Sequence, residues 1–133
     1  MEYSELIERI ETVADSDKRY KLDAYLFVIN ALEYTQRKKG KRGHVSGQEL
    51  LLGIRDYAKE LFGPTARMVF EHWGIRSTED FGEIVFNLID AGILGKSDRD
   101  SKKDFQNVYD FAEVFEKEYE WKIERPIQGP GGK

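Results

Sequence analysis

Five basic side chains lie within six residues of the chain, and a histidine follows two positions later. They are Arg37, Lys38, Lys39, Lys41, Arg42 and His44. Cations gathered at one place can bind phosphate groups, and RNA or a ribonucleoprotein is a partner class with this chemistry. The alternative is a solvated helix end, where lysines complement the helix dipole. We take these six residues as the candidate contact for an anion or a nucleic acid.

The residues that could support catalysis or metal binding form no recognised pattern. The chain has two histidines, His44 and His72, and neither stands at a metal-ligand spacing such as HExxH. His44, Ser46 and Glu49 are the one cluster close in sequence, and an acid–base role would need a further, distant partner. We therefore expect a non-catalytic protein with no metal and no cofactor, and an enzyme is the less favoured reading.

Two further stretches resemble ligand loops only in part. The segment DRDSKKD, residues 98–104, lacks the central glycine and the closing glutamate of a calcium loop, so a charged turn is expected there. The glycines of PIQGPGGK, residues 126–133, are not followed by the GK[ST] of a phosphate loop. Neither stretch predicts a binding site, and we expect residues 126–133 to form a flexible tail.

Apolar residues recur at helical spacing through most of the chain and predict six helices. These helices cover residues 2–14, 20–39, 47–62, 65–73, 78–91 and 111–121. Ser46 with Glu49, and Ser77 with Asp80, have the spacing of capping boxes. The helix over residues 20–39 has the broadest apolar surface, which predicts a central position.

The region from residue 65 to residue 109 predicts a winged helix-turn-helix. Two helices, 65–73 and 78–91, would be followed by a small β-hairpin within residues 93–109. Helical spacing from Phe105 to Tyr119 leaves a helix open as the alternative for part of this hairpin. The second helix carries four acids, which would repel a DNA backbone, and this argues against sequence-specific DNA binding.

The composition of the chain limits the number of domains and the class of protein. The chain has 133 residues, 40% of them hydrophobic, a formal net charge of −4 and no cysteine. These values predict one helical domain over residues 1–125, with a winged-helix-like core over about 20–120. There is no apolar run long enough for a membrane span, and the chain starts with the acidic sequence MEYSELIERIE. We expect a cytoplasmic protein that has no membrane partner.

Three segments of the chain resemble one uncharacterised bacterial protein family, described as repeat-type. They are RGHVSGQELLLGIRDYAKELFGP, HWGIRSTEDFGEIVFNLIDAGILGK and DSKKDFQNVYDF, at residues 42–64, 72–96 and 100–111. The resemblance extends over roughly residues 20–119 and implies a bacterial source. It implies no activity, because the family has no assigned function.

Together these observations predict a mainly α, compact helical domain with a winged-helix-like centre and one small β-hairpin. The expected function is a non-catalytic binding module whose basic stretch, residues 37–42, contacts RNA or a ribonucleoprotein. The alternative is a protein–protein adaptor that binds through acidic helix faces. A winged-helix DNA binder and an enzyme are less favoured.

Overall fold

A computed structural model describes residues 2–40, 43–95 and 101–117 of the chain. Within these residues there are five α-helices and no β-strand, so the prediction of a mainly α protein is confirmed. The α-helices are α1 (Tyr3–Ser16), α2 (Leu22–Lys39), α3 (Gly47–Phe62), α4 (Ala66–His72) and α5 (Thr78–Asp90). Three short helical turns complete the described structure: η1 (Gly63–Thr65), η2 (Lys102–Phe105) and the π-helical η3 (Ala112–Lys117). No helix of the described residues is long and apolar enough to cross a membrane.

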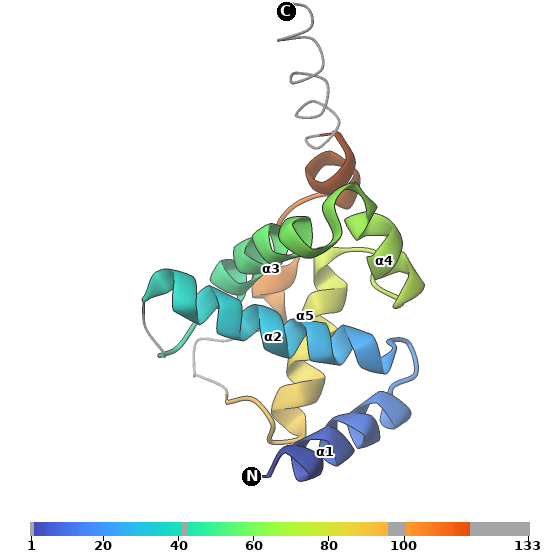
Figure 1. The fold of residues 1–133 in the computed structure, drawn as a ribbon, viewed down its shortest axis with the longest axis vertical. Helices are drawn as coiled ribbons and strands as arrows, with labels where there is room; N and C mark the ends of the chain where they lie inside the picture. The colour runs from blue at the N-terminus through green and yellow to red at the C-terminus, as the bar shows by residue number, and fades with distance from the viewer. Residues whose placement is uncertain (1, 41–42, 96–100, 118–133) are drawn as a thin grey trace, which may run out of the picture.

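Helix α2 lies at the centre of the fold, as its broad apolar surface predicts. Figure 1 shows α2 crossing the molecule, with α3 on one side, α1 on the other and α5 behind. Its residues Tyr25, Val28 and Ala31 are fully buried. Such a helix, covered on several faces, holds its neighbours in fixed positions around it.

Side-chain caps set the start of α3 and α5, as their sequences predict. The Ser46 hydroxyl accepts a hydrogen bond from the Glu49 backbone N–H at 3.1 Å, and the Glu49 carboxylate accepts one from the Ser46 N–H at 2.9 Å. Ser77 and Asp80 form the second capping box. Each box satisfies backbone donors that the first turn of a helix leaves without a partner.

An aromatic cluster forms the part of the core between α2, α4, α5 and η3. Phe70 on α4 is fully buried at its centre. Its ring centroid lies within 5.2–5.7 Å of four other phenylalanine rings, those of Phe27, Phe81, Phe111 and Phe115. Several of these pairs have the edge-to-face geometry that aromatic rings prefer.

The expected wing is not formed, and this part of the prediction is wrong. Residues 93–95 and 101–109 contain no strand, while residues 96–100 lie outside the described structure. Ser101 and Asp104 instead form a capping box that starts the 3₁₀ turn η2. This turn places Phe105 against α3 and α5, where it is 3% exposed. Over the described residues 105–117, the alternative of one continuous helix is not formed either.

A close fit and two hydrogen bonds explain why residues 101–109 pack as a turn. Cβ atoms built at Gly47 and Gly82 would lie 2.8 and 2.9 Å from the Phe105 side chain, so only glycine leaves room for that ring. The buried Thr78 hydroxyl donates to the Phe105 carbonyl at 2.7 Å and accepts from the Val108 N–H at 3.2 Å. Backbone groups that a hairpin would pair are therefore bonded to the start of α5.

The last predicted helix, residues 111–121, is present in part. Phe111 is helical, and the π-helical turn η3 follows it to Lys117, where the described structure ends. The Asp110 carboxylate accepts a hydrogen bond from the Glu113 N–H at 3.0 Å and so caps the start of this turn. The predicted tail, residues 126–133, lies outside the described residues.

Candidate binding site

The basic stretch begins on the last turn of α2. Arg37, Lys38 and Lys39 are exposed there, and Gly40 ends the helix with a φ of +72°. Exposed His44 follows on the segment that leads into α3, whereas Lys41 and Arg42 lie outside the described residues. The three cations also stabilise the helix itself, because they face the negative end of its dipole.

The three described cations differ in what surrounds them. Lys39 forms an ion pair with Glu49, the capping residue of α3. The Lys38 ammonium lies 5.5 Å from the centre of the Tyr34 ring, a cation–π contact. Neither Arg37 nor Lys38 forms an ion pair with another described residue. Of the three described cations, these two are therefore the ones that an anionic partner could bind without competing with an acidic side chain.

A pocket of about 380 Å³ opens beside the end of α2. It lies between α2, α3 and α5 and is closed by residues 43–45, 94–95 and Phe105. Most of its lining is apolar: Leu32, Val45, Leu50, Val85, Phe86, Ile89, Leu94 and Phe105. The polar side chains in the lining are those of Gln36 and His44, both at the end that the basic stretch forms.

Helical geometry brings part of the basic stretch to the rim of this pocket. Leu32, Gln36 and Lys39 are spaced four and three residues apart, so they share one face of α2. The Gln36 side-chain amide donates to the Gly43 carbonyl at 3.3 Å and links the end of α2 to the segment before α3. The Lys39–Glu49 pair is a second link across the same gap. Cationic and amide donors thus lie next to an apolar cavity.

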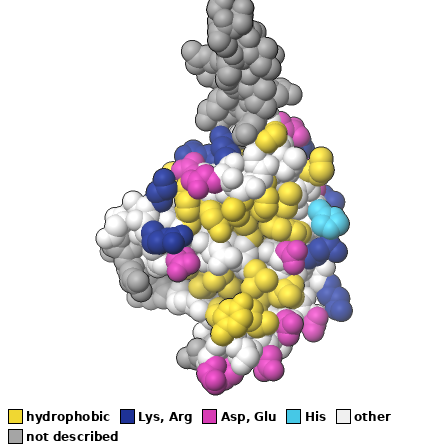
Figure 2. All heavy atoms as spheres, in the orientation of Figure 1, with side chains coloured by type: hydrophobic (Ala, Val, Ile, Leu, Met, Phe, Trp, Pro, Cys, Tyr) yellow, Lys and Arg dark blue, Asp and Glu magenta, His cyan; other side chains and the backbone are white. Residues whose placement is uncertain are grey.

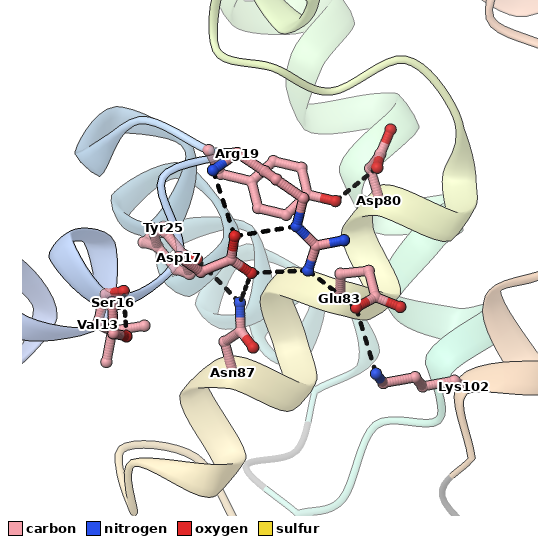
Figure 3. A network of polar contacts seen from close by, with 10 residues as sticks. Val13, Ser16, Asp17, Arg19, Tyr25, Asp80, Glu83, Asn87 and Lys102 are labelled. Carbon is pink, nitrogen blue, oxygen red and sulfur yellow. Dashed lines mark hydrogen bonds and ion pairs between the residues drawn. The ribbon is translucent and has the colours of Figure 1, made fainter.

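A second polar cluster lies where the link between α1 and α2 meets α5 (Figure 3). The Arg19 guanidinium donates two hydrogen bonds to the Asp17 carboxylate, at 2.9 and 2.7 Å, and one to Glu83 at 3.1 Å. The Asn87 amide donates to Asp17 at 2.8 Å and to the Tyr25 hydroxyl at 3.0 Å. We call these five residues the α5 clamp.

The charged and polar groups of the α5 clamp already have partners within the protein. Hydrogen bonds from Arg19 are the main cause that holds the pKa of the Asp17 carboxyl well below its usual range, and Asn87 acts in the same direction. Lys102 adds an ion pair to Glu83 at 3.2 Å and ties η2 to the same helix. Because its charges already face opposite charges, the clamp serves to hold three segments together.

Replacing Asp17 with asparagine is expected to lower stability at neutral pH and to leave it nearly unchanged in strong acid. A carboxyl whose pKa is depressed by folding stabilises the protein above its unfolded pKa, and this contribution is lost as the pH falls. This loss is progressive from about pH 5 down to the depressed folded pKa, so urea unfolding at pH 7 and at about pH 2 measures the difference. The matched control is exposed Asp15→Asn, for which we expect little change at either pH. An Asp17 effect of equal size at both pH values would contradict the assignment.

Within the cluster of His44, Ser46 and Glu49, the last two residues form a helix cap. The Ser46 hydroxyl and the Glu49 carboxylate hydrogen-bond to each other's backbone N–H groups, and Glu49 also pairs with Lys39. His44 lies in the pocket lining, while His72 is exposed at the end of α4. In the described part of the chain, no group of three or more His, Cys, Asp or Glu residues could hold a metal ion.

Sequence reasoning identified the basic stretch but missed the pocket beside it. The lining residues come from three helices, two connecting segments and the turn η2, so no local spacing marks them. One available signal was the extra apolar residue Phe86, which lies outside the main stripe of α5 and faces the pocket. Comparison with protein-family models, curated proteins and solved structures finds no match. The family resemblance of the three segments therefore stays a prediction.

Proposed function

We propose that the protein is a non-catalytic binding module that contacts an anionic partner through its basic stretch. The partner class is RNA or a ribonucleoprotein, and the contact residues are Arg37, Lys38, Lys39, Lys41, Arg42 and His44. The observation that carries the proposal is the exposure of Arg37 and Lys38 without an acidic partner among the described residues. The cysteine-free composition and the family resemblance favour a bacterial cytoplasm as the setting.

The distribution of charge supports a local contact. Residues 37–44 contain five bases and no acid, in a chain whose formal net charge is −4. A phosphate backbone would be repelled by the acidic remainder and attracted at this one end of α2. Lys39 contributes less than its neighbours, because Glu49 already neutralises much of its charge. The expected interaction is weak in total affinity and strongly dependent on salt.

Substituting Arg37 and Lys38 with serine is expected to weaken RNA binding and to reduce its salt dependence. Each phosphate contact to a single strand contributes about 0.7 to the slope of log affinity against log salt, so losing two lowers the slope by about 1.4. Fluorescence anisotropy with a labelled single-stranded RNA, over a series of salt concentrations, gives both quantities. Thermal melts should be nearly unchanged, because both side chains are exposed.

The matched control removes the same charge elsewhere. Lys18 and Lys21 are exposed on the link between α1 and α2, and serine at both positions alters net charge equally. This variant should retain the affinity and the salt slope of the parent. If the Arg37/Lys38 variant and the Lys18/Lys21 variant bind RNA equally well, binding depends on net charge and not on the basic stretch. If the parent binds no RNA even at low salt, the proposal is wrong.

The second candidate is a protein–protein adaptor that binds through an acidic helix face. Helix α1 exposes Glu5, Glu8, Glu11 and Asp15. Figure 2 shows acidic side chains along the lower edge of the molecule, where Figure 1 places α1. This candidate predicts that Glu8→Lys with Glu11→Lys abolishes binding to a protein partner, while Arg37→Ser with Lys38→Ser does not.

A further inference from the structure

The apolar pocket beside the basic stretch has no role in contacting a phosphate backbone. We propose that it binds a medium-chain alkyl carboxylate. The alkyl chain would lie against the apolar lining, and the carboxylate would lie near the lining residues Gln36 and His44. Lys39 follows Gln36 on the same face of α2, next to this end of the pocket. The proposal concerns a small-molecule ligand and stands whether or not the protein binds RNA.

The lining fits a flexible aliphatic chain. Its volume of about 380 Å³ lies in the range of small-molecule pockets, and its walls are mostly leucine, isoleucine and valine side chains. Ile89 and Leu94 are partly exposed there, although residues on the neighbouring faces of the same core are fully buried. Covering these side chains with an alkyl chain would remove apolar surface from water, which is favourable in proportion to the area.

The rim fits an anionic head group. Gln36 contributes an amide and His44 an imidazole to the lining itself, and Lys39 follows Gln36 on the same face of α2. Lys39 is paired with the Glu49 carboxylate, so a ligand carboxylate would share the Lys39 ammonium with Glu49. Exposed Arg37 and Lys38 on the same helical turn raise the local positive potential further. A cationic head group would meet repulsion, and a neutral one would gain no ion pair.

The test uses decanoate, with decanol and decyltrimethylammonium as probes of the same chain length. In ¹³C-methyl NMR spectra of the full chain, decanoate should shift the methyl signals of Leu32, Val45, Ile89 and Leu94 in a saturable manner. It should bind more tightly than decanol, and decyltrimethylammonium should bind most weakly. If these methyl signals do not respond to decanoate, or if decanol binds equally well, the proposal is overturned.

Separate variants test where the alkyl chain and where the carboxylate of the ligand bind. Leu94→Trp, and independently Ile89→Trp, should fill the pocket and weaken decanoate binding by roughly tenfold or more. Leu52→Trp is the matched control, because Leu52 is 44% exposed on α3 and does not line the pocket. Lys39→Gln should remove the preference for decanoate over decanol while leaving decanol binding intact.

These variants also separate this proposal from the RNA contact. Arg37→Ser with Lys38→Ser should reduce RNA affinity and leave the pocket methyl shifts in place, with at most a few-fold loss for decanoate. Decanoate binding that is unchanged in both tryptophan variants would place the ligand elsewhere and overturn the proposal. Thermal melts of each variant identify any that are unfolded, and binding is compared among the folded ones.

Discussion

Replacing Phe70 with alanine is expected to lower the free energy of unfolding by about 3–5 kcal/mol. The Phe70 side chain is 0% exposed and lies among rings that belong to α2, η3 and α5. Removing the ring loses its burial and leaves a cavity that the surrounding helices cannot close without moving. Because a domain of this size is stable by only about 5–15 kcal/mol, this one change removes a large share of its stability.

Urea unfolding and thermal melting measure the effect, and the midpoint temperature should fall by about 10 °C or more. Met68 supplies a control on the same helix, since its side chain is 69% exposed. Met68→Ala should change stability by less than about 0.5 kcal/mol. Equal, small losses for the two variants would mean that the aromatic cluster is not packed as described.

The helices could be predicted because their signals are local. Apolar residues at spacing three and four mark the buried faces, and the spacing of Ser46–Glu49 and Ser77–Asp80 marks two starts. Helix α3 agrees with its prediction at both ends, and the other α-helices agree within about two residues. Stretches of this kind form their hydrogen bonds within one segment, so the segment contains most of the necessary information.

The structure of residues 101–109 could not be predicted correctly because it depends on residues that are distant in the sequence. The sequence allows a strand over residues 105–109 or a helix that starts there, and neither describes the structure that these residues form. Phe105 fits between α3 and α5 only because Gly47 and Gly82 have no Cβ atoms. The Ser101–Asp104 capping box is a local feature, whereas the turn after it is held by Thr78 and Glu79, over twenty residues earlier.

The two parts of the candidate site also differ in whether local sequence predicts them. The basic stretch is a run of charge and is evident in any reading of the sequence, whereas the pocket is assembled from segments between residues 32 and 105. Partly exposed Tyr57 and Phe62 on α3 are another case, since both rings contact that of buried Phe27 on α2. Residue types alone do not show whether such side chains meet a neighbour or water.

Replacing Gly74 with alanine is expected to cost about 3 kcal/mol or more of stability. Gly74 has a φ of +94°, where a side chain adds strain of about 1–2 kcal/mol. An added Cβ would also lie 2.0 Å from the Arg19 carbonyl oxygen, which is backbone and cannot turn away. The turn between α4 and α5 would have to separate from the link between α1 and α2, where the Lys21 N–H now donates to the Trp73 carbonyl at 3.1 Å. Overpacking of this kind adds about 1–3 kcal/mol.

A substitution at Gly40 separates backbone strain from steric crowding. Gly40 also has a positive φ, but there is open space where an added Cβ would lie. Its φ is +72°, and nothing lies within 4 Å of an added Cβ. Gly40→Ala should therefore show the strain alone, about 1–2 kcal/mol, and urea unfolding of both variants gives the difference. If Gly74→Ala is no more destabilising than Gly40→Ala, then Arg19 and Gly74 are not in contact. The same result would mean that the α5 clamp holds the link between α1 and α2 without support from the packing of the Arg19 carbonyl against Gly74.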